Sequence, residues 1–277
     1  MRRTGARPPC RPPPPARAEH ADLVLREDAD GIARLTLNRP AARNALSMEM
    51  MAALQARLDA IAGEGAVKCV ILAAAGPGIC AGHDLKQMMA HKGDAAYYRR
   101  VFETCSALMT SIVRLPQLVI AEVQGVATAA GSQLVASCDL AIAASAARFA
   151  LPGVNIGLFC STPMVAVSRN VARKHVMEML VTGELISAEK ACEIGLINRV
   201  VAPAALAAET AGLAAQIVAK SPHTLKVGKE AFYRQVEMPL DDAYAYTGQV
   251  MAENMLAADA VEGITAFIDK RPPTWEE

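Results

Sequence analysis

The sequence predicts an α/β fold in which a largely parallel sheet is followed by a helical C-terminal region. Short apolar runs, typical of strands buried on both faces, alternate with loops and helical segments, and this repeated order favours parallel pairing. From Ser187 onward, apolar residues follow helical spacing almost throughout. We therefore divide the chain into a disordered, basic, proline-rich tail (1–22), an α/β core (23–200) and a helical C-terminal region (201–277).

The first elements of the core are predicted from alternation and capping signals. Ile32–Leu37 alternates like a strand and ends at the turn signal Asn38-Arg39-Pro40. Ser47 suits the N-cap of a helix over Met48–Ala62, where apolar residues recur at helical spacing. The apolar run Lys68–Ala75 then predicts a strand that is covered on both faces.

The middle and the end of the chain continue this pattern. After a loop over Ile79–Asp84, a helix is expected to begin near Leu85. The next predicted elements are a strand over Leu118–Val123, a helix of small residues over Ala129–Ser137, a strand over Leu140–Ala143, an extended segment over Phe149–Val154 and a helix over Pro163–Arg173. The predicted C-terminal helices are Ser187–Glu193, Ala204–Ala219, His223–Gln235 and Leu240–Met255.

Composition excludes several classes of function. Lys+Arg and Asp+Glu are both 28 in 277 residues, whereas a nucleic-acid binder usually has a basic excess. The 7 cysteines contain no CxxC pair and no zinc-like spacing, so we expect reduced thiols and no metal. The low-charge stretch Val123–Ala147 contains Asp139 and two glycines, which favours a soluble core over a membrane span. A GxGxxG dinucleotide motif is absent, so no redox cofactor is expected.

The N-terminal tail leaves the location of the protein open. Its first eighteen residues contain five arginines and six prolines but no acidic residue, a composition typical of organelle transit peptides. The Pro12–Pro15 run, however, disfavours the amphipathic helix that such peptides form. The high alanine content suits a bacterial cytoplasmic protein. We therefore expect a cytoplasmic location, with the mitochondrial matrix as the alternative if the tail is a transit peptide.

A set of short motifs occurs in a fixed order along the chain. They are CAGHDLK (Cys80–Lys86), VIAEVQG (Val119–Gly125) followed by Ala130-Gly131, SCDL (Ser137–Leu140), TGELISA (Thr182–Ala188) and GITAF (Gly263–Phe267). This ordered set resembles the crotonase (enoyl-CoA hydratase/isomerase) superfamily over about Leu23 to Arg271, and the stretch Pro152–Pro163 indicates a particular subgroup.

This resemblance implies a crotonase-like spiral of repeated ββα units with a helical C-terminal trimerisation region. It also implies a homotrimer or hexamer, an acyl-CoA thioester as ligand, and a place in fatty-acid metabolism. Coenzyme A would be part of the substrate, so no separate cofactor or metal is expected.

The resemblance further implies an oxyanion hole formed by the backbone N–H groups of His83 and Ala130. Preorganised donors of this kind contribute about 3–4 kcal/mol each in acyl-transfer enzymes. Relatives commonly have glycine where Ala130 stands, and alanine fits there only if its φ is negative. Gly131 lets the following helix begin close to the ligand, where the N-terminal dipole favours an anion. For the His83 side chain we favour a non-catalytic role over that of a base.

Both glutamates of the family's hydratases are missing here. The resemblance places them at Gln133 and Gly153, where they would hold and activate one water. Gln133 can hydrogen-bond but cannot take a proton near neutral pH, and Gly153 has no side chain. Efficient hydration is therefore not expected. Two interpretations stay open: a CoA-thioester enzyme with weak or altered chemistry, or a non-catalytic acyl-CoA-binding regulatory or scaffold protein.

Four cationic or aromatic residues are candidates for contacts with coenzyme A. Lys86 is expected either to reach a CoA phosphate or to lie solvated on a helix. The resemblance places Phe267 near the adenine and Lys270 near a phosphate, often in a neighbouring subunit, and Arg271 could assist. The alternative for these three is a surface helix end whose cations complement the dipole.

The remaining polar candidates have mainly structural interpretations. Asp84 is expected to be an N-cap. Glu122 lies in a buried run and is expected either to pair with an arginine or to serve the site. For Cys160 and Ser161 we favour packing, with Ser161 or Thr162 capping the helix that begins at Pro163, over a nucleophilic role.

Overall fold

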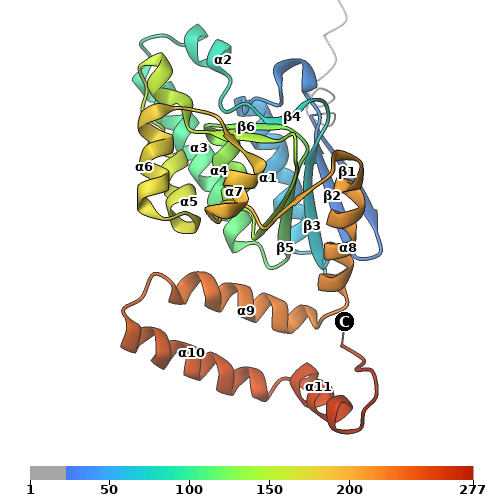
Figure 1. The fold of residues 1–277 in the computed structure, drawn as a ribbon. Coiled ribbons are helices and arrows are strands. Elements are labelled where there is room, and N and C mark those ends of the chain that lie inside the picture. The colour runs from blue at the N-terminus through green and yellow to red at the C-terminus, as the bar shows by residue number, and fades with distance from the viewer. Residues whose placement is uncertain (1–22, 277) are drawn as a thin grey trace, which may run out of the picture.

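The computed structural model describes residues 23–276, which form two sheets and the helices around them (Figure 1). The larger sheet has six strands in the order β1-β2-β3-β5-β7-β10, and the smaller has four in the order β4-β6-β8-β9. Apart from the β1–β2 and β8–β9 pairs, neighbouring strands are parallel. The α/β prediction is therefore confirmed, while the predicted tail (1–22) lies outside the described residues.

The strands of the larger sheet are β1 (Val24–Ala29), β2 (Ile32–Leu37), β3 (Cys69–Ala74), β5 (Leu118–Val123), β7 (Leu140–Ala144) and β10 (Arg199–Val201). Those of the smaller sheet are β4 (Gly78–Cys80), β6 (Val126–Thr128), β8 (Arg148–Ala150) and β9 (Ile186–Ser187). The helices before the last four are α1 (Met48–Ala62), α2 (Leu85–Ala90), α3 (Ala95–Arg114), α4 (Ala130–Ser137), α5 (Pro163–Asn170), α6 (Arg173–Thr182) and α7 (Ala188–Glu193).

Three consecutive ββα units build the core. They are β3 and β4 with α2 and α3, β5 and β6 with α4, and β7 and β8 with α5. In each unit the first strand joins the larger sheet and the second joins the smaller one. This arrangement confirms the predicted crotonase-like spiral, and it brings the turns that follow β4 and β6 beside one another.

The two faces of the larger sheet pack against different helices. Because side chains alternate along a strand, Val119 and Ala121 of β5 face the main core with α1, α3 and α4. Ile120 lies on the opposite face and packs with Ala214 of α8 (Leu206–Val218). The candidate site described below lies on the side of the larger sheet that packs with α1, α3 and α4, at the point where α4 begins.

The last three helices lie beneath this body in Figure 1. They are α9 (Pro222–Gln235), α10 (Leu240–Met255) and α11 (Ala258–Ile268). A buried lysine of α9, Lys229, donates to the carbonyl oxygens of Ile112 (3.1 Å) and Gln117 (2.9 Å) and to Oδ2 of Asp139 (2.7 Å). This lysine joins α9 to the core.

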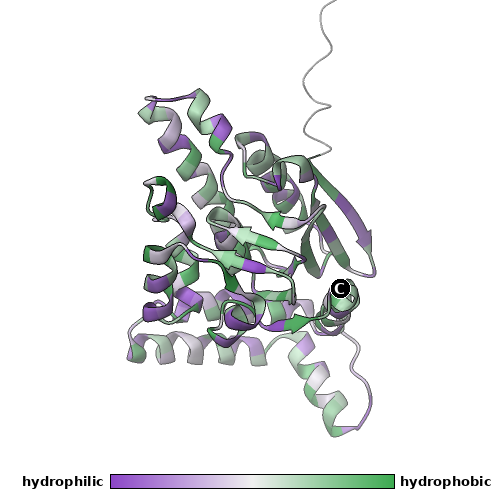
Figure 2. Cartoon of the chain, turned by 45° about the horizontal axis from the view of Figure 1, so that its top comes forward, coloured by the Kyte–Doolittle hydropathy of each residue, from purple (hydrophilic) through white to green (hydrophobic). Residues whose placement is uncertain are grey.

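Several large apolar side chains on these helices are exposed, and Figure 2 shows hydrophobic residues along them. They are Phe232, Val236, Leu240, Tyr244, Met251, Met255, Leu256, Val261, Ile264, Phe267 and Ile268. Within residues 23–276, no helix combines the length and the apolarity that crossing a bilayer requires.

Two predicted segments differ from the structure. The helix predicted over Pro163–Arg173 is broken at Val171, which is extended (φ −114°, ψ 140°), so α5 ends at Asn170 and α6 starts at Arg173. The extended segment predicted over Phe149–Val154 ends early, because Pro152–Ile156 forms a 3-10 helix. Proline fixes φ near the helical value, which suits the start of such a turn.

Candidate functional site

A buried asparagine fixes the chain that leads into the site. Asn44 is fully buried and adopts a left-handed conformation (φ 53°), which asparagine tolerates better than most residues. Its Nδ2 donates to the carbonyl oxygens of Ala75 (2.9 Å) and Gly78 (3.0 Å). Its Oδ1 accepts from the N–H of Arg39 (2.8 Å). These bonds hold the residues before and within β4. We did not predict this role, although an asparagine next to a turn signal is consistent with it.

The chain after β4 presents the N–H of His83 on one side. Leu46 N–H donates to Gly82 O (2.8 Å), and Asp84 N–H donates to Leu46 O (3.2 Å). Because successive N–H groups of an extended chain point in opposite directions, the His83 N–H faces away from Leu46. That is the side on which β4 pairs with β6. Within the described residues this N–H has no hydrogen-bond partner.

The N–H of Ala130 begins α4 beside this segment. As the first residue of the helix, Ala130 has no acceptor four residues earlier within α4, and its N–H has no partner among residues 23–276. A β-carbon added to Gly82 would lie 3.6 Å from the nitrogen of Ala130, so the two segments are in close contact. The unusual backbone is at Ala129 (φ 50°, ψ −116°), whereas Ala130 is not among the residues with positive φ. Alanine is therefore accepted at position 130.

The side chain of His83 is held neutral. Its ring packs edge-on against Phe102 of α3, with ring centroids 5.4 Å apart. Burial lowers the pKa of His83 to about 4, because the charged form loses its solvation. Its Nε2 atom is buried and has no hydrogen-bond partner within the described part of the chain. A ring that gains a proton only near pH 4 is a weak base, so the geometry favours the non-catalytic interpretation.

Gln133 lies one helical turn after Ala130 and is only 3% exposed. Its backbone is anchored in α4, where Ser137 Oγ donates to its carbonyl oxygen (2.8 Å). Its side-chain Oε1 accepts from Cys105 Sγ of α3 at 3.9 Å, a long contact to a weak donor. The position therefore holds an amide where the resemblance implies a carboxylate.

The second position at which the resemblance places a glutamate is Gly153. The neighbouring loop over residues 158–160 packs closely against it. A β-carbon added at Gly153 would lie 2.8 Å from Leu158 O and 3.0 Å from Cys160 Sγ. Cys160 is 6% exposed, and burial raises the pKa of its thiol. The expected packing role of Cys160 agrees with this arrangement. The loop occupies the volume from which a glutamate side chain would start.

The predicted capping residues of α5 do not cap it. Thr162 is the N-cap residue, but its side chain makes no capping hydrogen bond. The Ser161 hydroxyl instead donates to Phe159 O (3.4 Å). That prediction was wrong, because Thr162 has helical dihedral angles (φ −77°, ψ −41°) instead of the extended ones that place a capping oxygen near the N–H groups of the first turn.

Two acidic residues have structural partners. Asp84 is the N-cap of α2, accepting from Gln87 N–H (3.0 Å), and it also pairs with Arg39 (2.5 Å). Glu122 is paired with Arg34 of β2. By alternation along β5, Glu122 lies on the same face as Ile120, which packs with α8. Of the two expectations for Glu122, pairing with an arginine is therefore confirmed.

The coenzyme candidates are far apart within one chain. Lys86 is exposed on α2, close to His83 in sequence. Phe267, 84% exposed, and Lys270 lie on or just after α11, which Figure 1 places at the opposite end of the molecule from α2. Arg271 forms a bidentate ion pair with Glu262, with N–O distances of 2.7 and 2.8 Å. One chain alone does not bring α11 and the residues after it to the N–H groups of His83 and Ala130 (Figure 1).

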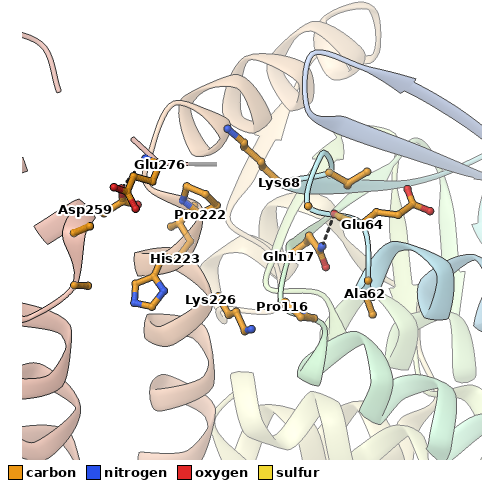
Figure 3. A pocket seen from close by; sticks show the side chains of 16 residues that line it. Ala62, Glu64, Lys68, Pro116, Gln117, Pro222, His223, Lys226, Asp259 and Glu276 are labelled. Atoms are coloured by element: carbon orange, nitrogen blue, oxygen red, sulfur yellow. Dashed lines mark hydrogen bonds between the residues drawn. The ribbon is translucent and has the colours of Figure 1, made fainter. Parts of the chain in front are cut away.

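A cavity of about 610 Å³ lies elsewhere, between the core and the C-terminal helices (Figure 3). Lys68 and Gln117, at the amino ends of β3 and β5, line it together with His223 and Lys226 of α9. None of the site residues predicted from the sequence lines this cavity. In parallel sheets, ligands bind at the carboxyl ends of the strands, so His83 and Ala130 remain the candidate site. Within residues 23–276, no group of three or more His, Cys, Asp or Glu residues is arranged to hold a metal.

Comparisons with known proteins agree with this geometry. The family described as enoyl-CoA hydratase/isomerase matches residues 27–277. The mitochondrial enoyl-CoA hydratase domain-containing protein 3 of Xenopus laevis is 47% identical over 93% of this chain and 87% of its own length. A crystal structure of an enoyl-CoA hydratase from Mycobacterium smegmatis is 52% identical, with a TM-score of 0.89, covering 91% of this chain and 98% of that one. The human enoyl-CoA hydratase domain-containing protein 3 is 45% identical, also with a TM-score of 0.89, covering 91% and 100%. The subgroup indicated by Pro152–Pro163 is the domain-containing protein 3 type, and these matches confirm it.

Proposed function

Because the chain belongs to the enoyl-CoA hydratase/isomerase family, we propose that it binds acyl-CoA thioesters and polarises their carbonyl group. The observation that carries this proposal is the pair of N–H groups on His83 and Ala130, which have no partner among residues 23–276 and lie in segments that contact each other. Both are backbone groups, so their positions do not depend on side-chain rotamers. As negative charge develops on the thioester oxygen, two preorganised donors stabilise it.

Removing one donor tests this proposal. Ala130→Pro deletes the N–H at the first position of α4, whereas Ala130→Gly keeps the N–H. Folding of the proline variant is checked by urea denaturation, because Ala129 (φ 50°, ψ −116°) lies outside the extended region that is preferred before proline. The probe is a para-dimethylaminocinnamoyl-CoA thioester, whose absorption moves to longer wavelength when its carbonyl is polarised. We expect a red shift with the wild type and with Ala130→Gly, and a loss of about half of that shift or more with Ala130→Pro. A full shift in the proline variant, with bound probe, would contradict the oxyanion assignment.

A second candidate function is acyl-CoA binding without turnover. Two observations support this candidate. Gln133 has an amide and no carboxylate, and a β-carbon at Gly153 would collide with Leu158 and Cys160. Such a protein would act as a regulator or scaffold of fatty-acid metabolism. The enzyme alternative would use the same two N–H groups with weak or altered chemistry.

Hydration of crotonyl-CoA separates the two candidates. We expect slow hydration by the wild type, seen as a slow loss of the enoyl absorbance, because two proton-transfer groups are missing. Gln133→Glu restores one of them and is expected to raise the rate by about 10²-fold, with Gln133→Met as the inactive control. A fast wild type, or a folded Gln133→Glu variant with no gain, would overturn this account. Gly153→Glu is not a suitable partner for this test, because its β-carbon meets backbone at 2.8 Å.

We also propose that coenzyme A is shared between subunits. Phe267 and Lys270 are exposed and distant from His83 within one chain, so a neighbouring copy in a homotrimer or hexamer would have to supply them. The exposed apolar residues of α10 and α11 support such an assembly, because surfaces of this kind mark interaction sites. The vertebrate relatives carry the word mitochondrial in their names, which supports the mitochondrial matrix over the cytoplasm as the location.

A further inference from the structure

The helix that follows the His83 N–H has no apolar anchor. No residue of α2 is buried, and the side chains of Leu85 and Met89 are 48% and 59% exposed. Helices in proteins usually keep their place because an apolar face packs on the core. Since α2 lacks such a face, its start depends on polar contacts for its position, and so does the N–H of His83 just before it.

Arg39 makes one of these contacts from the turn that precedes α1. Its guanidinium pairs with Asp84, the N-cap residue of α2, with an Nη2–Oδ2 distance of 2.5 Å. The backbone of Arg39 is itself fixed, because its N–H donates to Oδ1 of the buried Asn44 (2.8 Å). Asn44 also donates to the carbonyl oxygen of Gly78 in β4. Through Arg39, one support therefore holds both the strand before the loop 81–84 and the end of that loop.

The two halves of this loop are held differently. Two backbone hydrogen bonds to residues 43–46, of 3.0 and 2.8 Å, fix the first half. After His83, one longer backbone bond follows, from Asp84 N–H to Leu46 O (3.2 Å). The Asp84 side chain adds the pair with Arg39 at Oδ2, while its Oδ1 accepts a bond from the first turn of α2. The residue next to the His83 N–H is therefore tied to the segment before α1 by this ion pair.

One turn into α2, Gln87 makes a separate link to the start of α1. Its Oε1 accepts from Met48 N–H (2.9 Å), and its Nε2 donates to the Glu49 carboxylate (2.8 and 3.0 Å). This link supports the body of the helix, whereas the Arg39 pair acts at its first residue. Removing Arg39 is therefore expected to displace the start of α2 without releasing the whole helix.

We propose that Arg39 is a positioning residue of the thioester site, which acts through its ion pair with Asp84 to hold the His83 N–H in place. Its role rests on the carbonyl polarisation proposed above. A donor has to stay within about 0.5 Å of its productive position, so a small displacement of the loop is enough to weaken polarisation. The ion pair adds little to global stability, because the Arg39 side chain is 32% exposed. Polarisation and stability are therefore separable by mutation.

The test measures the red shift of para-dimethylaminocinnamoyl-CoA at saturation, which reports only on bound probe and hence on folded protein. Arg39→Met is expected to lose about half of the wild-type shift and to keep a urea midpoint close to that of the wild type. Arg39→Lys is expected to retain most of the shift, because the pair is formed through one N–H···O contact that lysine can also make. Arg99→Met, the same change at an exposed arginine of α3, is the control and should show the full shift.

Asp84→Asn approaches the same pair from the other side, because it removes the charge and keeps a good N-cap. It is expected to lose as much of the shift as Arg39→Met, and the double variant should lose no more than either single variant. A full shift in Arg39→Met, or losses that add in the double variant, would overturn the assignment of Arg39 while thioester polarisation stands. An Arg39→Lys variant as defective as Arg39→Met would show that the ion pair is not the cause.

Two further outcomes keep the test decisive. If Arg39→Met fails to fold, Asp84→Asn takes its place, and a full shift in that variant overturns the assignment. If the wild type binds the probe without a red shift, both this role of Arg39 and the proposed polarisation are overturned.

Discussion

Gly131→Ala is expected to lose about 3 kcal/mol of unfolding free energy and most of its thioester polarisation. A β-carbon at this position would lie 2.0 Å from the carbonyl oxygen of Cys80 and 2.8 Å from its carbonyl carbon. Both are backbone atoms of β4, so no side-chain rotation relieves the overlap. The start of α4 must move away from β4, and this separates the N–H of Ala130 from that of His83. Urea denaturation and the red shift of the cinnamoyl probe measure the two effects.

The matched control for that substitution is Gly212→Ala. Gly212 is an exposed glycine within α8, and a β-carbon there meets nothing within 4 Å. This variant is expected to gain about 0.4–1 kcal/mol, because alanine restricts the unfolded chain and favours the helix. If Gly131→Ala is as stable as Gly212→Ala and still shifts the probe, the close approach of α4 to β4 is not required.

Lys229→Met is expected to destabilise the fold by about 3–5 kcal/mol. The side chains of Lys229 and Asp139 are 3% and 6% exposed, and burial raises the pKa of Asp139 and lowers that of Lys229, since each charge loses solvation. Their mutual attraction opposes both shifts. Removing the lysine leaves the Asp139 carboxylate buried without its cation and also frees two backbone carbonyls. The urea midpoint is the measurement.

Lys226→Met provides the comparison on the same helix. Lys226 is exposed, so its replacement is expected to change the unfolding free energy by less than about 0.5 kcal/mol. A Lys229→Met variant no less stable than Lys226→Met would show that α9 is held to the core by apolar packing and not by this ion pair. Both variants should be compared at one protein concentration, because assembly would add to apparent stability.

The sequence predicted those strands and helices in which apolar residues alternate or recur at helical spacing, or which begin at a capping residue. β2, α1, β5 and α10 have the boundaries expected from alternation, from Ser47 and from apolar spacing. The 20-residue α3 was not predicted, although Asp94 caps it by accepting from Tyr97 N–H (2.9 Å). The short strands β4, β6 and β9 are only two or three residues long. Their pairing is decided by contacts between distant segments, which a local pattern does not contain.

Of the candidate site, the sequence indicated only the part that consists of backbone groups. Motif order placed the N–H groups of His83 and Ala130, and the structure brings their segments together. What surrounds them depends on tertiary packing: the anchoring by Asn44, the amide of Gln133 beside Cys105, and the neutral ring of His83 against Phe102. No spacing in the sequence indicates that helix α3 would meet both of these side chains.

For laboratory evolution, the packing around Gly153 means that an acidic side chain at this position requires changes in two segments of the chain. Most variants in a library that changes position 153 alone are expected to misfold, because the β-carbon of any side chain there would lie 2.8 Å from Leu158 O. Such a library would therefore test few folded proteins for activity. Substitutions that move residues 158–160 away from position 153 must come first, and the acidic side chain at position 153 can follow. The order of substitutions, and not their number, would determine whether selection can find the activity.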